Sequence, residues 1–432
     1  MNLEIENKRK KAILFLFFIS FFPFLLLFFD NSLIDNFWHK FANITGFIGT
    51  IFLIWQFILG VRGFSKWLTY DYDWIIKIHT FLGINGALMI FLHPILETIV
   101  YKKDFGHIFI LNFETEFNIF LSLGKIAFFL YLLIWISSSL LRKALKYRLW
   151  LYIHYLSYPM ILLVLIHPFQ IGSFLEGNIL VFYYWMLICL IAVLILIFKF
   201  LDIFNITNKK FEVIEVNYFP GDTFTIKYKP VESSFKSIFP GQYFYIKKSY
   251  ISEAHPFSIL EYSDDTNELI FGIKKLGKYS TLLSETKVGD IHYLDGPFGQ
   301  FTFEGHNEDP KVILAGGIGI TPFYELVSQF GNKNTFLFYA NKNLDTALYR
   351  SKFKEILGKN YFDFILDKLD SPAENIFCEV ITGTKINELL IGDLNSFKFF
   401  ICGSPGFTKA MILCLKEIGI SRKNIFIEEF EY

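Results

Sequence analysis

The sequence predicts a two-part membrane protein, in which six membrane-spanning helices precede a soluble half made of an antiparallel barrel and an α/β domain. Three observations lead to this fold class. The 432 residues are 53% hydrophobic with a mean hydropathy of +0.40, which is too apolar for an ordinary soluble protein. The long apolar runs lie before residue 202, and short alternating runs follow them. We expect the domains to span 1–206, 207–306 and 307–432.

Six apolar stretches are long enough to cross a bilayer, which takes about 20 residues per helix. We place them at roughly 11–29, 41–60, 74–100, 117–141, 149–169 and 179–201. Lys and Arg collect in the loops on the amino-terminal side, beginning with the basic run 8–11, whereas acidic residues predominate on the other side. Because cytoplasmic loops carry an excess of Lys and Arg, we expect a multi-pass protein of the plasma or inner membrane with both termini in the cytoplasm. No small-residue cleavage site follows the first run, so we expect it to be retained.

Four histidines lie within these apolar stretches, where an ionisable side chain is costly and marks a functional site by default. His79 and His93 fall on the third span, and His154 and His167 fall on the fifth. The third and fifth spans run in the same direction, so His79 should pair with His154 near the cytoplasm and His93 with His167 near the outer face. The two levels would be about 20 Å apart. We predict two b-type haems, each held by two imidazoles, an arrangement that suits electron transfer.

Helical geometry constrains these pairs. A separation of fourteen residues brings His93 to within about 40° of the helix face of His79. A separation of thirteen residues leaves His154 and His167 about 140° apart around an ideal helix. We expect Pro159 to distort the fifth span and correct this mismatch. Histidines that hydrogen-bond within a bundle or relay protons are the alternative interpretation, and a metal-ion transporter is another.

Three other ionisable residues lie near the outer face. His39 and His107 fall in predicted outer loops and are not expected to be haem ligands. Glu97, one helical turn beyond His93, is interpreted in two ways. It either holds a metal chelate or delivers protons, or it is a solvated helix end.

The soluble half starts with a pattern of short strands separated by Pro and Gly turns, as in a small antiparallel barrel. The expected strands are Phe211–Asn217, Thr223–Lys229, Tyr243–Lys247, Glu268–Ile273 and Ile291–Leu294. After residue 309 the pattern becomes strand, glycine turn and helix, which is typical of a parallel sheet with crossover helices.

A glycine-rich turn at 312–323 is the strongest local motif of the last domain. A buried strand enters Gly316, Gly317 and Gly319, with Thr321 expected as the helix N-cap and Pro322 in the first turn. Glycines let the backbone approach a pyrophosphate, whose negative charge a helix N-terminus favours. An ordinary strand-to-helix connection is the alternative.

The motif His-Pro-Phe-Ser at 255–258 carries a family resemblance, together with Phe-Pro-Gly-Gln-Tyr at 239–243 and the run 272–280. This set resembles the flavin-binding barrel of the ferredoxin–NADP reductase superfamily. The His-Pro-Phe-Ser form resembles the NADPH oxidase and ferric reductase branch. Asp-Gly-Pro-Phe-Gly at 295–299, the glycine turn and Phe-Ile-Cys-Gly-Ser-Pro at 400–405 match in the expected order, as do the paired histidines. The resemblance covers nearly the whole chain.

This resemblance implies FAD in the barrel and NADPH, or NADH, in the last domain. The residues expected to line the isoalloxazine and ribityl chain are His255, Pro256, Phe257 and Ser258. Those expected at the FAD pyrophosphate are Lys274, Tyr279 and Ser280, and Lys278 replaces an acid common in the family. The residues expected at the nicotinamide dinucleotide are Gly316, Gly317, Gly319, Thr321 and Pro322, with Cys402 and Gly403 beside the nicotinamide ring. A terminal aromatic residue, Phe430 or Tyr432, would cover the flavin until nicotinamide displaces it.

The preferred nicotinamide cofactor depends on the end of the strand Thr335–Ala340. An acid there would favour NADH through the ribose hydroxyls, whereas a cation favours the 2′-phosphate of NADPH. Lys342 therefore favours NADPH, and a solvated loop lysine is the alternative.

The expected function is outward electron transfer from cytoplasmic NADPH through FAD and two haems. Dioxygen, reduced to superoxide, is the favoured acceptor. A ferric chelate and an extracytoplasmic partner protein are the alternatives. The net charge of zero gives no indication of nucleic-acid binding. Because the sequence has no EF-hand loop, proline-rich tail or long cytoplasmic insertion, we expect activity without cytosolic activators.

Overall fold

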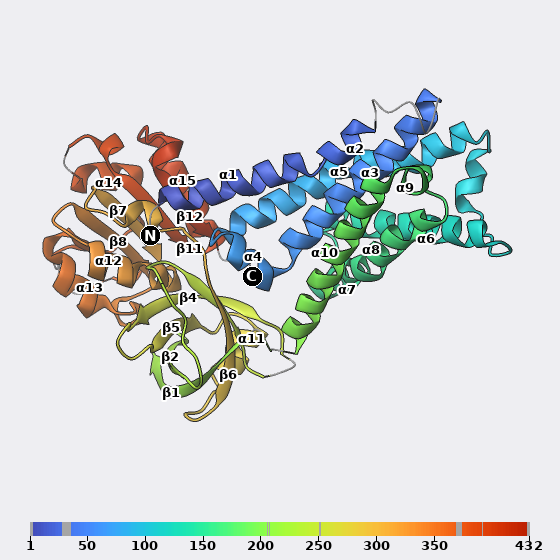
Figure 1. Cartoon of the computed structure of the whole chain (residues 1–432). Coiled ribbons are helices and arrows are strands. Elements are labelled where there is room, and N and C mark those ends of the chain that lie inside the picture. The colour runs from blue at the N-terminus through green and yellow to red at the C-terminus, as the bar shows by residue number, and fades with distance from the viewer. Residues whose placement is uncertain are drawn as a thin grey trace. The chain divides into compact units, whose positions relative to one another are not determined.

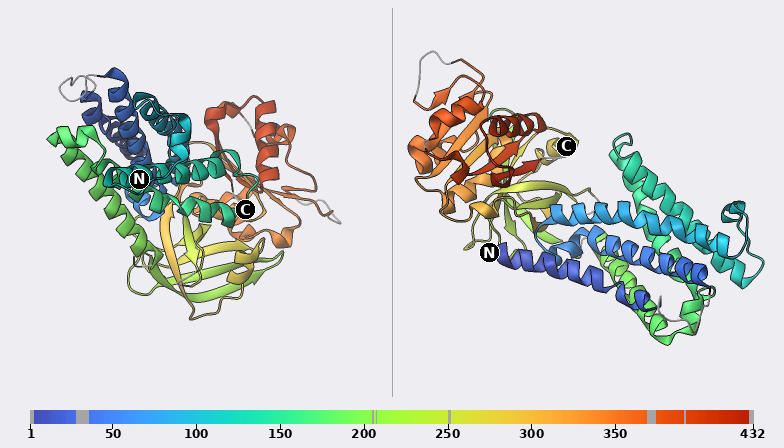
Figure 2. Two further views of the ribbon diagram at one scale, coloured as in Figure 1. Left: turned by 90° about the vertical axis from the view of Figure 1, so that its right-hand side faces the viewer. Right: turned by 90° about the horizontal axis from the view of Figure 1, so that it is seen from above.

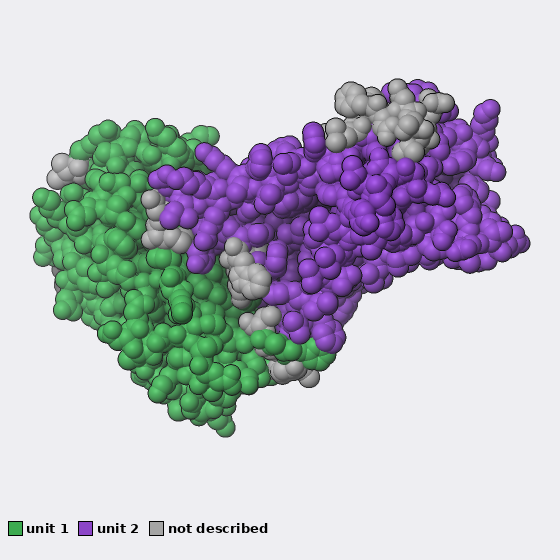
Figure 3. Space-filling model, in the orientation of Figure 1, with its two compact units in different colours: residues 1–3, 204–432 green, residues 4–203 purple. Residues whose placement is uncertain are grey.

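The computed structural model describes residues 3–27, 36–204, 206, 208–249, 252–368, 374–390 and 392–429. The chain divides into two compact units, one of residues 4–203 and one of residues 1–3 and 204–432 (Figure 3). The helices of the first unit run alongside one another, and the strands belong to the second unit (Figures 1 and 2).

Five helical segments among the described residues are long and apolar enough to cross a membrane. They are α3 (Phe37–Gly60), α5 (Tyr72–Val100), α6 with η2 (Glu116–Leu140), α7 to η3 (Tyr147–Phe169) and α10 (Ile179–Ile203). These segments correspond to the second to sixth predicted spans. The prediction of a multi-pass membrane protein is therefore confirmed.

The first predicted span, 11–29, is not one continuous helix. It is divided into α1 (Leu3–Ile19) and α2 (Phe22–Leu26), and residues 28–35 lie outside the described part of the chain. Ser20 Oγ donates to the carbonyl of Phe17 at 2.5 Å, a bond that competes with the helical ladder. Pro23 has no amide hydrogen for the carbonyl of Ile19. Both effects end the first helix at this point.

The fifth span breaks between its two histidines. It consists of α7 (Tyr147–Tyr155), α8 (Ser157–Ile166) and the 3-10 helix η3 (His167–Phe169). The break is a turn at Leu156. Pro159 has no amide hydrogen to donate to the carbonyl of Tyr155, so the helical ladder is interrupted there. The predicted distortion between His154 and His167 is confirmed, but it lies three residues before Pro159.

The six-stranded barrel of the second unit closes in the order β1-β2-β5-β4-β3-β6. Its strands are β1 (Lys209–Phe219), β2 (Thr223–Pro230), β3 (Tyr243–Lys247), β4 (His255–Tyr262), β5 (Leu269–Lys274) and β6 (Ile291–Phe298). The five predicted strands are present, with small differences at their ends. The sequence pattern did not predict β4, because buried and exposed residues do not alternate along this strand and because it begins at a proline-containing motif.

The α/β domain is a parallel sheet in the order β10-β9-β8-β7-β11-β12. Its strands are β7 (Lys311–Gly316), β8 (Thr335–Asn341), β9 (Tyr361–Ile365), β10 (Ile376–Phe377), β11 (Lys398–Gly403) and β12 (Ile425–Glu429). Its helices include α12 (Tyr324–Phe330), α13 (Arg350–Leu357), α14 (Gly383–Leu389) and α15 (Pro405–Glu417). Apolar clusters cover the two faces of this sheet.

The prediction of Thr321 as a helix N-cap is wrong. The glycines let the chain turn directly into a 3-10 helix, η5 (Gly317–Phe323), whose N-cap is Gly316. Thr321 Oγ1 donates instead to the carbonyl of Ile318 at 3.1 Å, and Pro322 lies inside the 3-10 helix. The α-helix that follows begins only at Tyr324.

Candidate functional site

The histidine pair that is predicted to lie near the cytoplasm, called the inner pair below, joins α5 to α7. The ring centroids of His79 and His154 are 6.1 Å apart. His79 Nδ1 lies 3.0 Å from the carbonyl oxygen of Gln56 on α3. His154 Nδ1 lies 3.3 Å from Ser138 Oγ, which also accepts a hydrogen bond from Trp150 Nε1. The pairing predicted from the topology is therefore present in the structure.

The pair that is predicted to lie near the outer face, called the outer pair below, repeats this arrangement. The ring centroids of His93 and His167 are 6.5 Å apart. His93 Nδ1 lies 2.9 Å from the carbonyl oxygen of Ala42, and His167 Nδ1 lies 2.7 Å from that of Val164. A carbonyl only accepts hydrogen bonds, so each of these Nδ1 atoms carries a proton, and in the neutral imidazole Nε2 is the nitrogen that can bind a metal.

These pairs fit bis-imidazole ligation of a haem iron. Two metal–nitrogen bonds of about 2 Å, with roughly 1 Å from each nitrogen to its ring centre, place two imidazole centroids about 6 Å apart. A hydrogen bond from Nδ1 to a backbone carbonyl orients a ligating imidazole and raises its basicity. Among the described residues, no group of three or more His, Cys, Asp or Glu is arranged to hold a bare metal ion.

Glycines make room beside three of the four histidines. A Cβ added to Gly46 would lie 2.9 Å from the ring of His93, and one added to Gly124 would lie 3.0 Å from that of His167. A Cβ on Gly60 would lie 3.3 Å from the ring of His79. Sequence reasoning missed these glycines. The signal was the 14-residue spacing of Gly46 and Gly60, which matches the spacing of the histidines on α5.

A cavity of about 270 Å³ adjoins the outer pair. The loop that joins α5 to α6, residues 101–115, forms part of its wall and is called the outer loop below. The polar residues that line the cavity besides the outer pair include His39, Asn43, Glu97, Tyr101, Lys103, His107 and Lys125. Glu97 is half-buried in this lining, so it is not a fully solvated helix end. His39 lies in the first turn of α3 rather than in a loop.

Two aromatic rings dominate the predicted flavin site. His255, at the start of β4, stacks on Tyr279 with ring centroids 4.0 Å apart. Tyr279 lies on α11 (Lys278–Leu283), and its hydroxyl donates to the carbonyl of Ile246 at 2.7 Å and accepts from the amide of Lys248 at 2.9 Å. Burial lowers the pKa of His255, although Glu253 opposes this shift. The neutral imidazole therefore offers a flat stacking surface. Pro256 is exposed, Phe257 is half-buried and Ser258 is buried.

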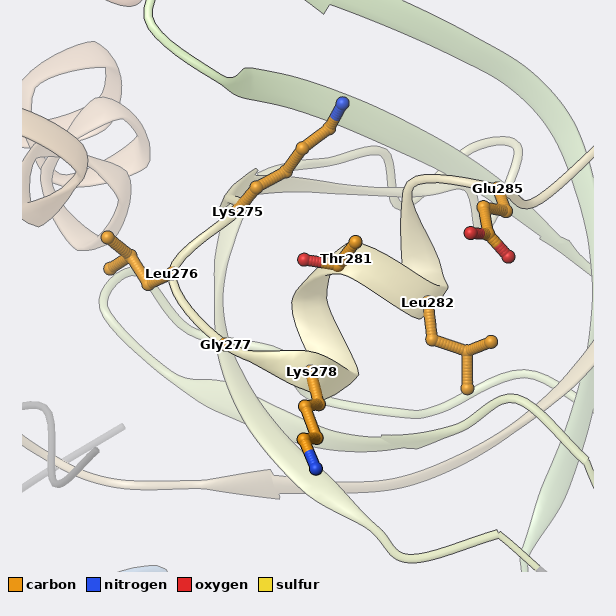
Figure 4. A pocket seen from close by; sticks show the side chains of 7 residues that line it. All are labelled: Lys275, Leu276, Gly277, Lys278, Thr281, Leu282 and Glu285. Atoms are coloured by element: carbon orange, nitrogen blue, oxygen red, sulfur yellow. The ribbon is translucent and has the colours of Figure 1, made fainter.

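The turn before α11 is stabilised from within. Ser280 Oγ accepts from the amides of Leu276 and Gly277, both at 3.0 Å, so this hydroxyl already has protein partners. An open pocket of about 520 Å³ lies at the same turn, and its basic residues are Lys275 and Lys278 (Figure 4). Their side chains point to opposite sides of the turn (Figure 4). Lys274, the predicted pyrophosphate contact, is half-buried and is not in this lining.

The glycine turn after β7 packs against the end of β11. A Cβ on Gly319 would collide with the carbonyl of Cys402, and Gly316 and Gly403 both lie under the ring of Phe407. These three glycines therefore allow the turn after β7 and the turn after β11 to pack closely against each other. Gly317 differs, because a Cβ there would meet nothing within 4 Å and its φ is +54°. Among the predicted glycines, Gly317 is the one with open space for a phosphate.

Cys402 is fully buried at the end of β11, within the apolar cluster that also contains Leu260 of the barrel. Burial raises the pKa of the Cys402 thiol, and the nearby Glu428 carboxylate raises it further. Glu428 is aligned with Cys402 on β12. Sequence reasoning missed Glu428, because this alignment depends on strand register. Phe430 and Tyr432 lie outside the described residues.

Family descriptions match three successive parts of the chain. A ferric reductase like transmembrane component matches residues 12–165, an FAD-binding domain matches 208–321 and an oxidoreductase NAD-binding domain matches 313–412. The chain has the architecture of the NADPH oxidase/ferric reductase family. The predictions of an oxidoreductase and of domains for FAD and a nicotinamide nucleotide are confirmed.

Individual relatives are similar to about half of the chain or less. The reductase component of propane 2-monooxygenase from Mycolicibacterium goodii is 27% identical over 240 residues, which cover 52% of this chain and 68% of that protein. NADH-cytochrome b5 reductase 2 from Candida albicans is 25% identical over 195 residues, 40% of this chain and 65% of that protein. The chain spans 60% of the matching Rhodococcus jostii propane 2-monooxygenase reductase component. The FAD/NAD-binding domain of a nitric oxide dioxygenase from Vibrio cholerae aligns with a TM-score of 0.45 at 20% identity, covering 51% of this chain and 98% of that chain.

Lys342 lies immediately after β8 and its side chain is exposed. Its carbonyl accepts from the amides of Leu366 and Asp367, both at 3.1 Å. The backbone at this position is therefore fixed while the ammonium group stays accessible to a ligand. This arrangement is compatible with the predicted preference for NADPH.

Proposed function

We propose that this chain oxidises cytoplasmic NADPH and reduces dioxygen to superoxide at the outer face of the membrane. One NADPH gives up a hydride, which carries two electrons. Two dioxygen molecules take one electron each, and one proton is released. Bound FAD would supply the conversion of a hydride into single electrons, and two bound haems would carry them across the bilayer.

The histidine pairs carry this proposal. At both levels the Nδ1 atoms are held by neighbouring oxygen atoms, and the centroid separations of 6.1 and 6.5 Å suit one metal between each pair. On α5 the two levels are separated by fourteen residues, about 20 Å along the helix. These side chains would bind and orient two haems at fixed depths in the membrane.

In the soluble half, the residues of the chain bind and position the two nucleotides. The stacked rings of His255 and Tyr279 offer a flat surface for the flavin. Gly317 offers an open backbone position for a phosphate, and Lys342 offers a cation for the 2′-phosphate of NADPH. The two-sided basic turn of Lys275 and Lys278 offers charge near the predicted FAD pyrophosphate.

Dioxygen is the favoured acceptor because of the outer cavity. Both predicted ligands of the outer haem line this cavity, so the haem would fill much of it, and the largely apolar lining favours an uncharged acceptor at the haem edge. The second candidate is a ferric chelate, and the cationic Lys103 in the same lining favours it.

The test uses purified full-length protein given FAD, haem and NADPH, with no other protein present. Cytochrome c reduction that superoxide dismutase abolishes would support the proposal. Dismutase-insensitive reduction together with fast turnover of ferric citrate would favour the second candidate. Absence of turnover with every acceptor would contradict both, and also the expected independence from cytosolic activators.

A further inference from the structure

The outer loop is fastened to α6 at two points. Lys125 Nζ donates to the carbonyls of His107 at 2.7 Å and Ile110 at 2.8 Å. Ser122 Oγ accepts from the amide of Asn112 at 2.9 Å and donates to the carbonyl of the same residue at 2.7 Å. Side chains of one helix thus hold the loop at both its middle and its end.

Lys125 is unusual because it lies within a predicted membrane span, ten residues into α6 (Glu116–Trp135). An ammonium group at such a position is costly unless it finds acceptors. Two of its three N–H groups are taken by carbonyls of the outer loop. The loop carbonyls therefore accept hydrogen bonds from the ammonium group, and the same bonds hold the loop against α6.

The fixed loop forms a wall of the outer cavity. His107 and Ile108 of the loop line this cavity together with His93 and His167. Lys125 also lines it. The segment that Lys125 and Ser122 hold therefore borders the space beside the outer histidine pair.

We propose that Lys125 is a positioning residue that sets acceptor specificity. By holding the outer loop in place as a wall of this cavity, it limits access to the edge of the outer haem, so that dioxygen reaches the haem and bulky ferric chelates do not. Ser122 assists by fixing the end of the same loop. This inference rests on the proposed outward electron transfer and adds the determinant of its acceptor class.

The experiment compares full-length Lys125→Met and Ser122→Ala with wild type. The measured quantity is the rate of ferric–EDTA reduction divided by the rate of dioxygen reduction, with NADPH as donor. We expect this ratio to rise by roughly five- to tenfold in Lys125→Met, the effect of losing the two charge-assisted hydrogen bonds that hold the loop in place. Ser122→Ala should raise it in the same direction without any change of charge. Lys102→Met, which removes an exposed charge from the same loop, is the matched control and should leave the ratio unchanged.

Hydrogen exchange gives a second readout that does not depend on activity. Amides of residues 105–112 should exchange faster in Lys125→Met and Ser122→Ala than in wild type or Lys102→Met. An unchanged acceptor ratio with unchanged exchange would overturn the inference. So would a ratio that rises in Lys125→Met but not in Ser122→Ala, because charge rather than loop position would then be responsible. Failure of wild type to reduce any outer acceptor would instead refute the proposed function.

Discussion

The membrane bundle and the soluble half prepare their sites in different ways. In the bundle, each predicted ligand such as His93 has one ring nitrogen held by a nearby oxygen atom of the bundle and the other left for a metal. In the soluble half, the polar side chains expected at the cofactors are already engaged within the protein, as Tyr279, Ser280 and Thr321 show. The bundle therefore depends on single side chains, whereas the soluble half relies on stacking and on backbone positions. Single substitutions should be far more damaging in the first than in the second.

The largest expected effect is that of His93→Leu. Loss of a ligand from the outer pair should remove about one haem per chain and slow outward transfer by roughly a hundredfold or more. Reduction of the flavin by NADPH should survive. Haem and flavin contents, with stopped-flow flavin absorbance, measure this. The matched control is His107→Leu, another histidine of the same cavity, which should retain both haems. Retention of both haems in His93→Leu would refute the assigned pairing.

Acid should weaken the barrel through His292. This side chain is 1% exposed, its Nδ1 lies 2.7 Å from the Tyr228 hydroxyl, and burial lowers its pKa from 6.5 to about 4. Below pH 6.5 the unfolded chain therefore binds a proton at His292, whereas the folded barrel does not. The stability that His292 contributes is complete above pH 6.5, and about 2 kcal/mol of it should be lost between pH 7 and pH 5. Urea titrations followed by flavin fluorescence measure this loss. His292→Gln should show a smaller pH dependence, and an equal dependence would contradict the assignment.

A methyl group at Gly46 should disturb the outer pair. The Cβ of Gly46→Ala would lie 2.9 Å from the His93 ring, so that ring must move. We expect haem affinity at the outer level to fall about tenfold, as when a group that orients a ligand is lost. Gly60→Ala is the matched variant at the inner level, where the distance to the ring of His79 is 3.3 Å, and its effect should be smaller. Equal haem retention in both variants would show that these glycines do not limit the site.

Removing the Tyr279 hydroxyl tests the soluble site. Tyr279→Phe loses the bonds to Ile246 and Lys248 but keeps the ring that stacks on His255. The loss should cost about 1–2 kcal/mol, or roughly tenfold in FAD affinity. Flavin fluorescence titration measures the affinity, and haem content should stay at the wild-type value. A loss of haem in this variant would contradict the view that the two halves of the chain build their cofactor sites independently.

The smallest expected effect is that of Lys342→Ala. An exposed ammonium contributes up to about 1 kcal/mol to binding a phosphate. The ratio of kcat/KM for NADPH to that for NADH should therefore fall about threefold, with NADH kinetics unchanged. Lys359→Ala, an exposed lysine elsewhere in the same domain, should leave the ratio unchanged. An unaltered ratio in Lys342→Ala would remove the basis for the NADPH preference.

Much of the architecture could be predicted from the sequence, because hydropathy and spacing act locally. The length of the apolar stretches located five of the six predicted spans and the positions of His79, His93, His154 and His167 within them. Hydropathy does not register hydrogen-bond breaks, so the division of the first span and the turn at Leu156 could not be located from it. Helix adjacency and strand register were also needed to find Gly46 and Glu428, since each acts on a residue far away in the sequence.

The central claim is that the two histidine pairs hold two haems in one path of electron transfer. The most direct test is an anaerobic optical titration of purified full-length protein with NADPH. The account predicts two haems per chain with low-spin bis-imidazole spectra, both becoming reduced together with the flavin. A single haem per chain, or two haems that stay oxidised while the flavin is reduced, would contradict it.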